Sequence, residues 1–562
     1  MNYIKKDLIK ELSKLPELSN IDLEKLIEIP PDKTLGDFSL PCFELAKSLK
    51  KNPNQISQEL SKKIIKIKAI KQIKSVGPYI NFYINPIFVI KQTLSKKPNK
   101  QELNIGKSKK VMVEFSSPNT NKPQHLGHLR NNLLGQSISN ILIKTNHKII
   151  RTSIINDRGI HICKSMLAYI LWGQNKRPNK KPDHFVGDFY VMYEKNAKQN
   201  PDLDKKLKEL LIKWEQGDKK TILIWKKLNS WVYQGFKQTY SYFDITFDKV
   251  YYESNIYKKA KQTIYSQLKK QTFEKKDGAI IADLSKYNLP EKVLIRSDGT
   301  SLYITQDIYL ALLRFKEYNP QKIIYVVANE QELHFKQLFA ILDLINKGKY
   351  TQKLYHLSYG YISLPQGRMK SRQGTVVDTD TLLKDLIELS KKELLKRNKL
   401  NKKQLEYKAK IIALSAIRVF FLKYDPLTDF VFNPESSISF DGETGPYILY
   451  TYARINSILK QQKPKKGKIN YSLLSTPQEI DIALHLSMLN DIIIKSSNEL
   501  KPSLIIRYIL ELCQKINGFY QKYQVLKAPE DLKFARLALL QKTKETLKKS
   551  LDLLSIKYLE KM

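Results

Sequence analysis

Three short apolar segments, each ending in polar residues, constrain the fold of this chain most strongly. They are VMVEFSSPN from residue 111, IIRTSIIND at 149–157 and KIIYVVANEQ at 322–331. Helical stretches separate them. Short apolar runs that alternate with helices predict a parallel α/β sheet, which binds its ligands at the carboxyl ends of the strands.

The rest of the chain divides around this sheet. A length of 562 residues exceeds one ordinary core and indicates about three domains. Residues 1–106 alternate helical and strand patterns, with a basic, glycine-poor linker at 94–110, and predict a small α+β domain. Residues 107–384 form the sheet domain, with a Lys-, Trp- and Tyr-rich insertion at about 175–285. The helical period dominates 385–562, which predicts an all-helical domain.

The charge indicates a polyanionic partner. Lys and Arg number 97 against 55 Asp and Glu, a formal net charge of +42. Nucleic acid, held through its phosphates, is the simplest such partner. Compositional drift is the alternative, since Lys, Asn and Ile crowd every part of a chain with few Gly and Pro.

The cysteines and the hydropathy exclude several classes of protein. Cys42, Cys163 and Cys513 lie far apart and never form a CxxC pair, so we expect no metal site and no disulfide framework. The chain shows no signal peptide and no run of the ~18 apolar residues that would span a bilayer. We expect a cytoplasmic protein with no membrane partner.

The stretch SSPNTNKPQHLGHLR places two of only eight histidines, His125 and His128, around Gly127. Their spacing puts both imidazoles on one face of the first turn of a helix that begins near His125. The free N–H groups of such a turn favour phosphate oxygens, and Gly127 leaves space for a flat ligand. Helix capping alone is the structural alternative, and metal ligation lacks a third ligand of suitable spacing.

A second basic stretch, GRMKSRQGTVV at 367–377, carries Arg368, Lys370 and Arg372 between glycines. Cations on a loop suit a triphosphate, because they neutralise charge in the transition state. Such a loop alone is more typical of a solvated surface. Together with the HxGH helix it resembles the motif pair of the class I aminoacyl-tRNA synthetases, usually written HIGH and KMSKS.

The resemblance is closest to the arginyl-tRNA synthetases and extends over essentially the whole chain. It is carried, in the family's order, by the blocks VEFSSPNTNKPQHLGHLRNNLLG, INDRGIHICKSMLAY, RSDGTSLYITQDIYLALLR, ANEQELHFKQLF and TGPYILYTYARINSIL. The N-terminal LGDFSLPCFELAK and GPYINFYIN also resemble that family. The resemblance implies a Rossmann-type catalytic domain, an N-terminal domain that grips the tRNA elbow near the D-loop, and a C-terminal helical domain that binds the anticodon.

The resemblance also implies a reaction. L-Arginine and ATP would give arginyl-adenylate and pyrophosphate, and the arginyl group would then pass to the terminal ribose of tRNA(Arg). Mg²⁺ is expected on the phosphates of ATP, without a dedicated protein site. Members of the family are often monomers and often need bound tRNA before they activate arginine, and we expect both here.

The family's substrate-binding residues correspond to positions in these blocks. The arginine-binding residues would be Glu114, Asn119, Tyr303, Asp307 and Gln331. Asp307 would bind the guanidinium through charge-assisted bonds, with Tyr303 beside it four residues earlier. Asn119 and Gln331 would meet the amino-acid end, and Glu114 would act directly or through an intervening residue.

The ATP-binding residues would be His125, Gly127, His128, Arg368, Met369 and Lys370. One position departs from the motif, because Ser371 stands where the second lysine of KMSKS is expected. Many arginyl enzymes that lack this lysine carry one just ahead of HIGH, which here is Lys122. We expect Lys122 to supply the missing charge, assisted by Lys370 or Arg372.

The tRNA-binding residues are expected on two domains. In the helical domain the tyrosines Tyr447, Tyr450 and Tyr452 interleave with Arg454, a pattern suited to splayed anticodon bases. Any one of these tyrosines is equally compatible with a helical core. Phe38, in GDFS, is the candidate for stacking at the tRNA elbow.

Two other functions stay open at this point. Small nucleotidylyltransferases also carry HxGH, although their chains are much shorter and have no helical C-terminal half. A synthetase-like RNA-binding protein without catalysis is the second alternative, against which His125, His128, Asn119, Asp307 and Gln331 argue.

Overall fold

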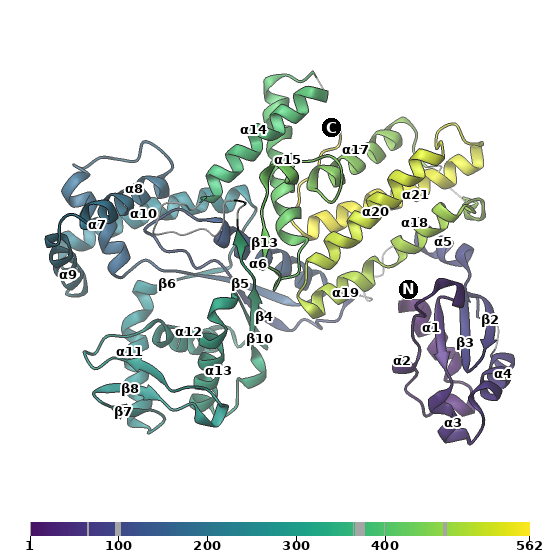
Figure 1. Cartoon of the computed structure of the whole chain (residues 1–562), viewed down its shortest axis with the longest axis horizontal. Coiled ribbons are helices and arrows are strands. Elements are labelled where there is room, and N and C mark those ends of the chain that lie inside the picture. Colours follow the sequence, from purple (N-terminus) through teal and green to yellow (C-terminus); the bar gives the residue numbers. More distant parts are fainter. Residues whose placement is uncertain are drawn as a thin grey trace.

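A computed structural model gives the fold of the chain and describes residues 2–64, 67–95, 103–363, 365, 377–397, 399–464 and 469–562. Figure 1 shows the N-terminal domain and the helices α7–α10 at opposite ends of the molecule, with the central sheet between them. Among the described residues, no helix is long and apolar enough to cross a membrane.

The N-terminal domain packs helices on a three-stranded antiparallel sheet of order β1-β3-β2. Its elements are α1 (Asn2–Leu12), α2 (Leu23–Leu26), β1 (Phe38–Pro41), α3 (Phe43–Leu49), α4 (Pro53–Lys63), β2 (Ile70–Val76), β3 (Tyr79–Ile84) and α5 (Pro86–Ser95). Helix α5 contacts α18 of the C-terminal domain, and Leu484 packs against the N-terminal core. The predicted α+β composition of this region is confirmed.

The central sheet is parallel throughout and has five strands in the order β11-β10-β4-β5-β6. Its strands are β4 (Lys110–Glu114), β5 (Lys148–Ile155), β6 (Lys249–Tyr252), β10 (Lys322–Ala328) and β11 (Leu354–Tyr359). The strand order reverses between β4 and β10, which is where open α/β sheets bind ligands. The predicted Rossmann-type sheet is confirmed.

Both faces of this sheet are buried, because helices cover each of them, and alternate residues of a strand point to opposite faces. Val113 and Ile324 join a core with α6 (Leu126–Lys144) and the C-terminal helices. Met112 and Ile323 join a second core with α12 (Tyr303–Tyr318) and α13 (Glu332–Asn346).

Two groups of elements interrupt the sheet. Helices α7 (Ile160–Trp172), α8 (Pro182–Ala197), α9 (Asp202–Glu215) and α10 (Lys219–Tyr242) lie between β5 and β6 and share a core of their own. Helix α11 (Glu253–Lys269) and an antiparallel sheet of β7 (Glu274–Lys276), β8 (Ala279–Ala282) and β9 (Lys292–Ile295) lie between β6 and α12.

The described residues of the C-terminal region are helical, as predicted, apart from connecting loops and one short strand. Its elements are α14 (Thr379–Arg397), α15 (Lys402–Leu422), β13 (Phe430–Val431), α16 (Pro434–Ser437), α17 (Gly445–Gln461), α18 (Pro477–Ser487), α19 (Leu489–Glu499), α20 (Ser503–Lys522) and α21 (Glu530–Leu553). Strand β13 pairs in parallel with β12 (Ile362–Ser363), which follows the last strand of the sheet. Two residues are too short a run for the sequence pattern to predict a strand.

Candidate active site

The predicted site residues gather at the carboxyl ends of the central strands. Asn119, in the segment after β4, forms an isolated parallel bridge with Asn156, which directly follows β5. Asn121 in the same segment is 3% exposed. Its side-chain oxygen, like that of Asn329 after β10, is buried without a hydrogen-bond partner among the described residues. Polar atoms of this kind are typical of a site that binds a ligand.

His125 and His128 lie at the N-terminus of α6, as the spacing predicted, and they also cap its first turn, which was the structural alternative. The backbone N–H of Gly127 donates to His125 Nδ1 at 3.1 Å, and the N–H of His125 donates to His128 Nδ1 at 3.2 Å. The two ring centroids lie 3.9 Å apart. A β-carbon at Gly127 would come within 2.9 Å of the His125 ring, so this glycine makes room for the imidazole itself.

Both imidazoles are neutral at pH 7. Burial, together with the nearby Lys122, lowers the pKa of His125 to about 4 and holds the pKa of His128 well below its usual range. Each Nδ1 accepts a backbone N–H, so the single ring proton of each neutral imidazole lies on Nε2. The pair therefore offers two N–H donors beside the N-terminus of a helix.

Lys122 and the end of the basic loop lie beside these histidines. Lys122 is half-buried, and burial lowers its pKa. Asp378 forms an isolated antiparallel bridge with His125, and the N–H of Thr379 donates to the carbonyl of Gln124 at 2.9 Å. The predicted residues Arg368, Met369, Lys370 and Arg372 lie outside the described residues. Asp378 and Thr379, which follow this loop in the chain, contact the histidine motif.

A second group of predicted residues lies on α12 and α13. Tyr303 is the first residue of α12 and is 67% exposed, and Asp307 stands four residues further on the same helix. Asp307 Oδ2 lies 2.8 Å from Nε2 of His334 in α13. Gln331 is exposed, at the turn between β10 and α13. The carboxylate of Asp307 thus sits in a partly exposed position, oriented by a histidine.

Glu114 lies deeper than these residues. It ends β4, is 6% exposed and forms an ion pair with the buried Arg314 of α12. The Arg314 guanidinium also lies over the rings of Tyr251 and Tyr325. The ion pair between Glu114 and Arg314 thus links the end of β4 to α12.

The sequence patterns missed Glu253, which lies near enough to Asp307 for the charge of that carboxylate to raise the pKa of Glu253. Glu253 follows β6 directly, is 4% exposed and is hydrogen-bonded to Gln306, the residue before Asp307. Arg158 lies 3.5 Å from Glu253 and 3.0 Å from Glu215. Burial raises the pKa of Glu253 to about 7, and Arg158 opposes that rise. The four-residue strand β6 was too short to recognise, although a carboxylate directly after it was the available signal.

Arg130, two residues after His128, was missed as well. Its guanidinium is buried and has no carboxylate ion-pair partner in the described part of the chain. It donates to the carbonyls of Gly360 at 2.7 Å, Pro426 at 2.8 Å and Thr428 at 2.9 Å. It also lies 4.7 Å from the ring of Phe430. The histidine helix is therefore tied both to the segment that follows β11 and to the connection between α15 and β13.

Two of the predicted tRNA-binding aromatics are core residues. Phe38 is 2% exposed inside the N-terminal core, and Tyr452 is 2% exposed against Tyr558. The predictions that these rings stack on nucleotides are wrong, because neither ring reaches the surface. On α17, Tyr447 is half-buried, whereas Tyr450 and Arg454 are exposed one turn apart. Tyr450 and Arg454 thus belong to the exposed face of that helix.

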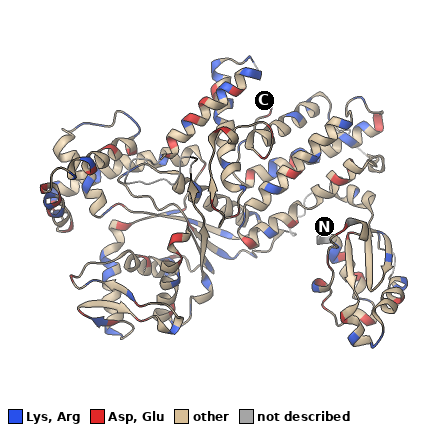
Figure 2. Ribbon diagram, viewed as in Figure 1, with Lys and Arg blue, Asp and Glu red and all other residues tan. Residues whose placement is uncertain are grey.

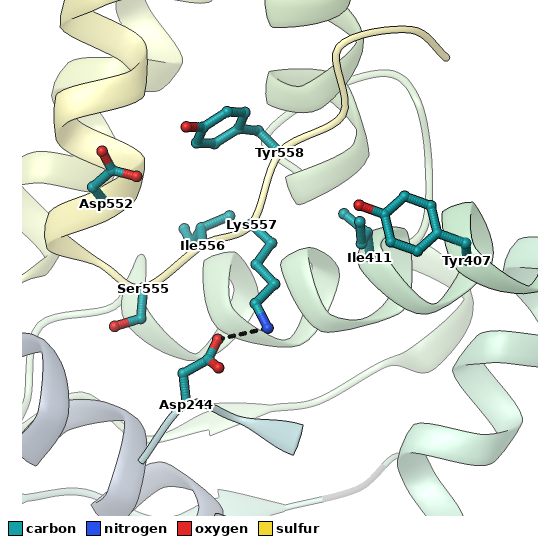
Figure 3. A pocket seen from close by; sticks show the side chains of 8 residues that line it. All are labelled: Asp244, Tyr407, Ile411, Asp552, Ser555, Ile556, Lys557 and Tyr558. Atoms are coloured by element: carbon teal, nitrogen blue, oxygen red, sulfur yellow. Dashed lines mark ion pairs between the residues drawn. The ribbon is translucent and has the colours of Figure 1, made fainter. Parts of the chain in front are cut away.

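A hollow of about 420 Å³ lies at a junction of three segments. Figure 3 shows Tyr407 and Ile411 of α15 facing Ser555–Tyr558 and Asp244, with Lys557 Nζ 3.1 Å from Asp244. No predicted site residue lines it. It marks where the C-terminal residues lie on the segment after α10, and it is separate from the histidine motif.

The charge is spread over the whole molecule. Figure 2 shows Lys and Arg on the N-terminal domain, the insertion helices and the C-terminal helices alike. The net charge of +42 is therefore not concentrated on one domain.

Three family models match the chain in succession. They are the arginyl tRNA synthetase N terminal domain at residues 2–84, the class I tRNA synthetase (R) catalytic domain at 89–434 and the DALR anticodon binding domain at 448–562. The arginine–tRNA ligase of Borreliella afzelii is 42% identical, over 98% of this chain and 96% of that protein. That of Treponema denticola is 41% identical, over 98% and 95%. The Thermus thermophilus arginyl-tRNA synthetase structure superimposes with a TM-score of 0.83 at 25% identity, over the full length of both chains.

Proposed function

The chain belongs to the arginyl-tRNA synthetase family and is an arginine–tRNA ligase, and from that premise we propose which of its residues carry each step. The enzyme activates arginine with ATP and transfers it to tRNA(Arg). The observation that carries the assignment is the bridge between His125 and Asp378. It joins the histidine motif to the end of the basic loop at the switch point of the sheet.

In the first step the arginine carboxylate attacks the α-phosphorus of ATP. An oxygen–phosphorus bond forms, the bond to the bridging oxygen breaks, and pyrophosphate leaves with its electron pair. The Nε2–H groups of His125 and His128 donate to the phosphate oxygens, and the N-terminus of α6 adds the positive end of its dipole. Gly127 keeps the His125 ring in place.

Lys122 supplies the positive charge at the phosphates. Burial lowers its pKa in the free protein, but phosphate oxygens favour its charged form when ATP binds. Arg368, Met369, Lys370 and Arg372 complete the ATP site in this proposal. Because Ser371 stands at the position of the second KMSKS lysine, Lys122 supplies the charge that this lysine would carry.

Asp307 and Glu253 bind the guanidinium of the substrate, with Tyr303 beside them. Two carboxylates suit a planar cation with five N–H donors, and lysine cannot match that geometry. Asn119 and Gln331 hold the amino and carboxylate end. Glu114 contributes through Arg314, which fixes α12 and with it Tyr303 and Asp307.

Mg²⁺ enters with ATP in this proposal, bound to the phosphates rather than to a protein site. Among the described residues, one group of carboxylates and histidine has a spacing suited to a metal, formed by Asp183, His184 and Asp380. It does not fit a cation, because Lys181 Nζ already lies 2.9 Å from Asp183 and 2.7 Å from Asp380. No step is therefore assigned to a protein-bound metal.

The tRNA contacts all three domains in this proposal. Residues 1–106 grip the elbow, 107–384 hold the acceptor end, and 385–562 bind the anticodon through Tyr447, Tyr450 and Arg454. The boundary near 384 stays a proposal, because α15 contacts both α6 and α17. We also propose that the enzyme is a cytoplasmic monomer and that tRNA binding precedes arginine activation.

Aminoacylation tests the function directly. Purified protein, ATP, Mg²⁺ and bulk tRNA are incubated with each radiolabelled amino acid in turn. Arginine alone should be charged. Tight, salt-sensitive tRNA binding without charging would instead indicate an RNA-binding protein that has lost catalysis.

Glu253 predicts a pH dependence. A carboxyl group with a pKa of about 7 is protonated below that pH and then loses its attraction for a guanidinium. We expect kcat/KM for arginine to fall about tenfold per pH unit below about pH 7 and to level off above it. Glu253→Gln should remove this limb and lower kcat/KM above pH 7 by about 30-fold.

Glu215→Gln is the matched control, because Glu215 also pairs with Arg158 but is half-exposed. This variant should keep the pH limb. A pH limb that persists in Glu253→Gln would contradict the assignment.

A further inference from the structure

A buried ion cluster joins the insertion to the start of α14. Lys181, just before α8, donates to Asp183 at 2.9 Å, to Asp380 at 2.7 Å and to Thr239 of α10 at 2.6 Å. His184 Nε2 lies 3.0 Å from the same oxygen of Asp380 and 3.6 Å from Asp378. The first turns of α8 and α14 are thus held together by charge.

The cluster is enclosed by three helices. The Asp183 side chain is fully buried, and those of Lys181 and Asp380 are 15% and 16% exposed. A β-carbon at Gly235 of α10 would come within 2.3 Å of the Asp183 carboxylate. Glycine is therefore required there for α10 to approach so closely. Charge pairs in such surroundings are weakly screened and fix geometry more firmly than surface pairs do.

The α14 side of the cluster continues to the histidine motif. The Asp378 carboxylate accepts the N–H groups of Asp380 at 3.0 Å and Thr381 at 2.9 Å, which caps α14. The backbone of Asp378 bridges His125. A displacement of this turn would move the segment that pairs with the ATP-binding histidine.

The α8 side reaches the lysine ahead of that motif. A β-carbon at Gly187, one turn after His184, would lie 2.9 Å from the Pro123 ring and 3.5 Å from the α-carbon of Lys122. Helix α8 therefore packs directly on the backbone that carries Lys122. Residues 181–187 thus contact two parts of the proposed ATP site, the backbone of Lys122 and the side chain of Asp378.

We propose that the start of α8 is a positioning platform for adenylate formation, in which Lys181, His184 and Asp380 hold Asp378 against His125 while Gly187 holds Lys122. These are positioning residues that touch neither substrate. The inference rests on the proposed roles of Lys122 and His125. The arginine-binding residues of α12 and α13 take no part in it, so its effect is confined to ATP and to the rate of activation.

The test is arginine-dependent ATP–pyrophosphate exchange, with tRNA present, in Asp380→Asn and Lys181→Met. Misplacing the phosphate-binding groups should lower kcat at least about tenfold and raise the KM for ATP, with the KM for arginine changed less than about twofold. Lys181→Arg should restore much of the rate, because its guanidinium can still bridge Asp183 and Asp380. If these residues only stabilised the fold, the KM values for ATP and for arginine would change together.

Lys180→Met is the matched control. It removes the neighbouring ion pair with Asp188 on the outside of the same helix and should leave exchange unchanged. Gly187→Ala provides an independent variant if the charge variants fail to fold, since it displaces Pro123 without altering the cluster. Its kcat should fall with the same KM pattern.

Folded Asp380→Asn or Gly187→Ala protein with wild-type exchange would overturn the platform, as would an arginine KM that rises as much as that for ATP. Failure of the proposed function would look different. In that case wild-type protein would show no arginine-dependent exchange, or Lys122→Ala would be fully active.

Discussion

Replacing Lys122 with alanine should lower arginine-dependent ATP–pyrophosphate exchange by about 10²-fold or more. Lys122 is half-buried beside His125 and His128, and both imidazoles are neutral at pH 7 because burial lowers their pKa. The two histidines can donate hydrogen bonds but carry no charge. A preorganised cation at the phosphates is therefore lost with the lysine, and the loss falls on the transition state.

The measurement is kcat for exchange at saturating ATP, arginine and tRNA. Lys122→Arg should retain more activity than alanine, since it keeps the charge. Lys144→Ala, at the exposed far end of α6, removes the same charge away from the site and should be unchanged. Activity of Lys122→Ala within a fewfold of wild type would show that another cation serves the phosphates.

Asp307→Asn should lower kcat/KM for arginine by about 10²-fold or more, because a charge-assisted bond to the guanidinium is removed from a partly buried site. The asparagine oxygen can still accept from His334, so α12 and α13 should stay in place. Only kcat/KM for arginine should fall, and the KM for ATP should stay close to that of wild type.

Steady-state charging over a range of arginine concentrations measures this effect. Asp283→Asn is the control for loss of a carboxylate, because Asp283 is an exposed residue directly after β8. This variant should keep the wild-type kcat/KM for arginine. An equal loss for ATP and arginine would mean that Asp307 supports the whole site rather than the guanidinium. Wild-type kcat/KM in Asp307→Asn would assign guanidinium binding to Glu253 alone.

Much of the fold and part of the site could be predicted from local patterns. The runs at 111–114, 149–155 and 322–328 are strands of the sheet, and polar residues follow each of them within a few positions. His125 caps α6 one residue before its first turn. A strand's apolar run and a helix cap are properties of a few neighbouring residues, so the sequence alone expresses them.

Residues whose role depends on distant partners could not be predicted in this way. Glu253 meets Gln306 only because β6 and α12 belong to one domain, and Arg130 bonds carbonyls about 230 and 300 positions away in the chain. For Phe38 and Tyr452 the error was the opposite one, because a function was predicted for residues that belong to the core. Their aromatic character was correct, but burial removed both rings from any RNA surface.

Local patterns were sufficient to predict three strands of the sheet, the helical C-terminal region, the histidine motif and the resemblance to one family, because each depends on contiguous residues. Which charges face one another depends on the packing of distant segments. The pairing of Glu114 with Arg314, the ring of contacts around Arg130 and the cluster from Lys181 to Asp380 all join segments far apart in the chain. Packing brings such groups within a few ångströms, and the Coulomb energy and the exclusion of water that give them their chemistry exist only at that range.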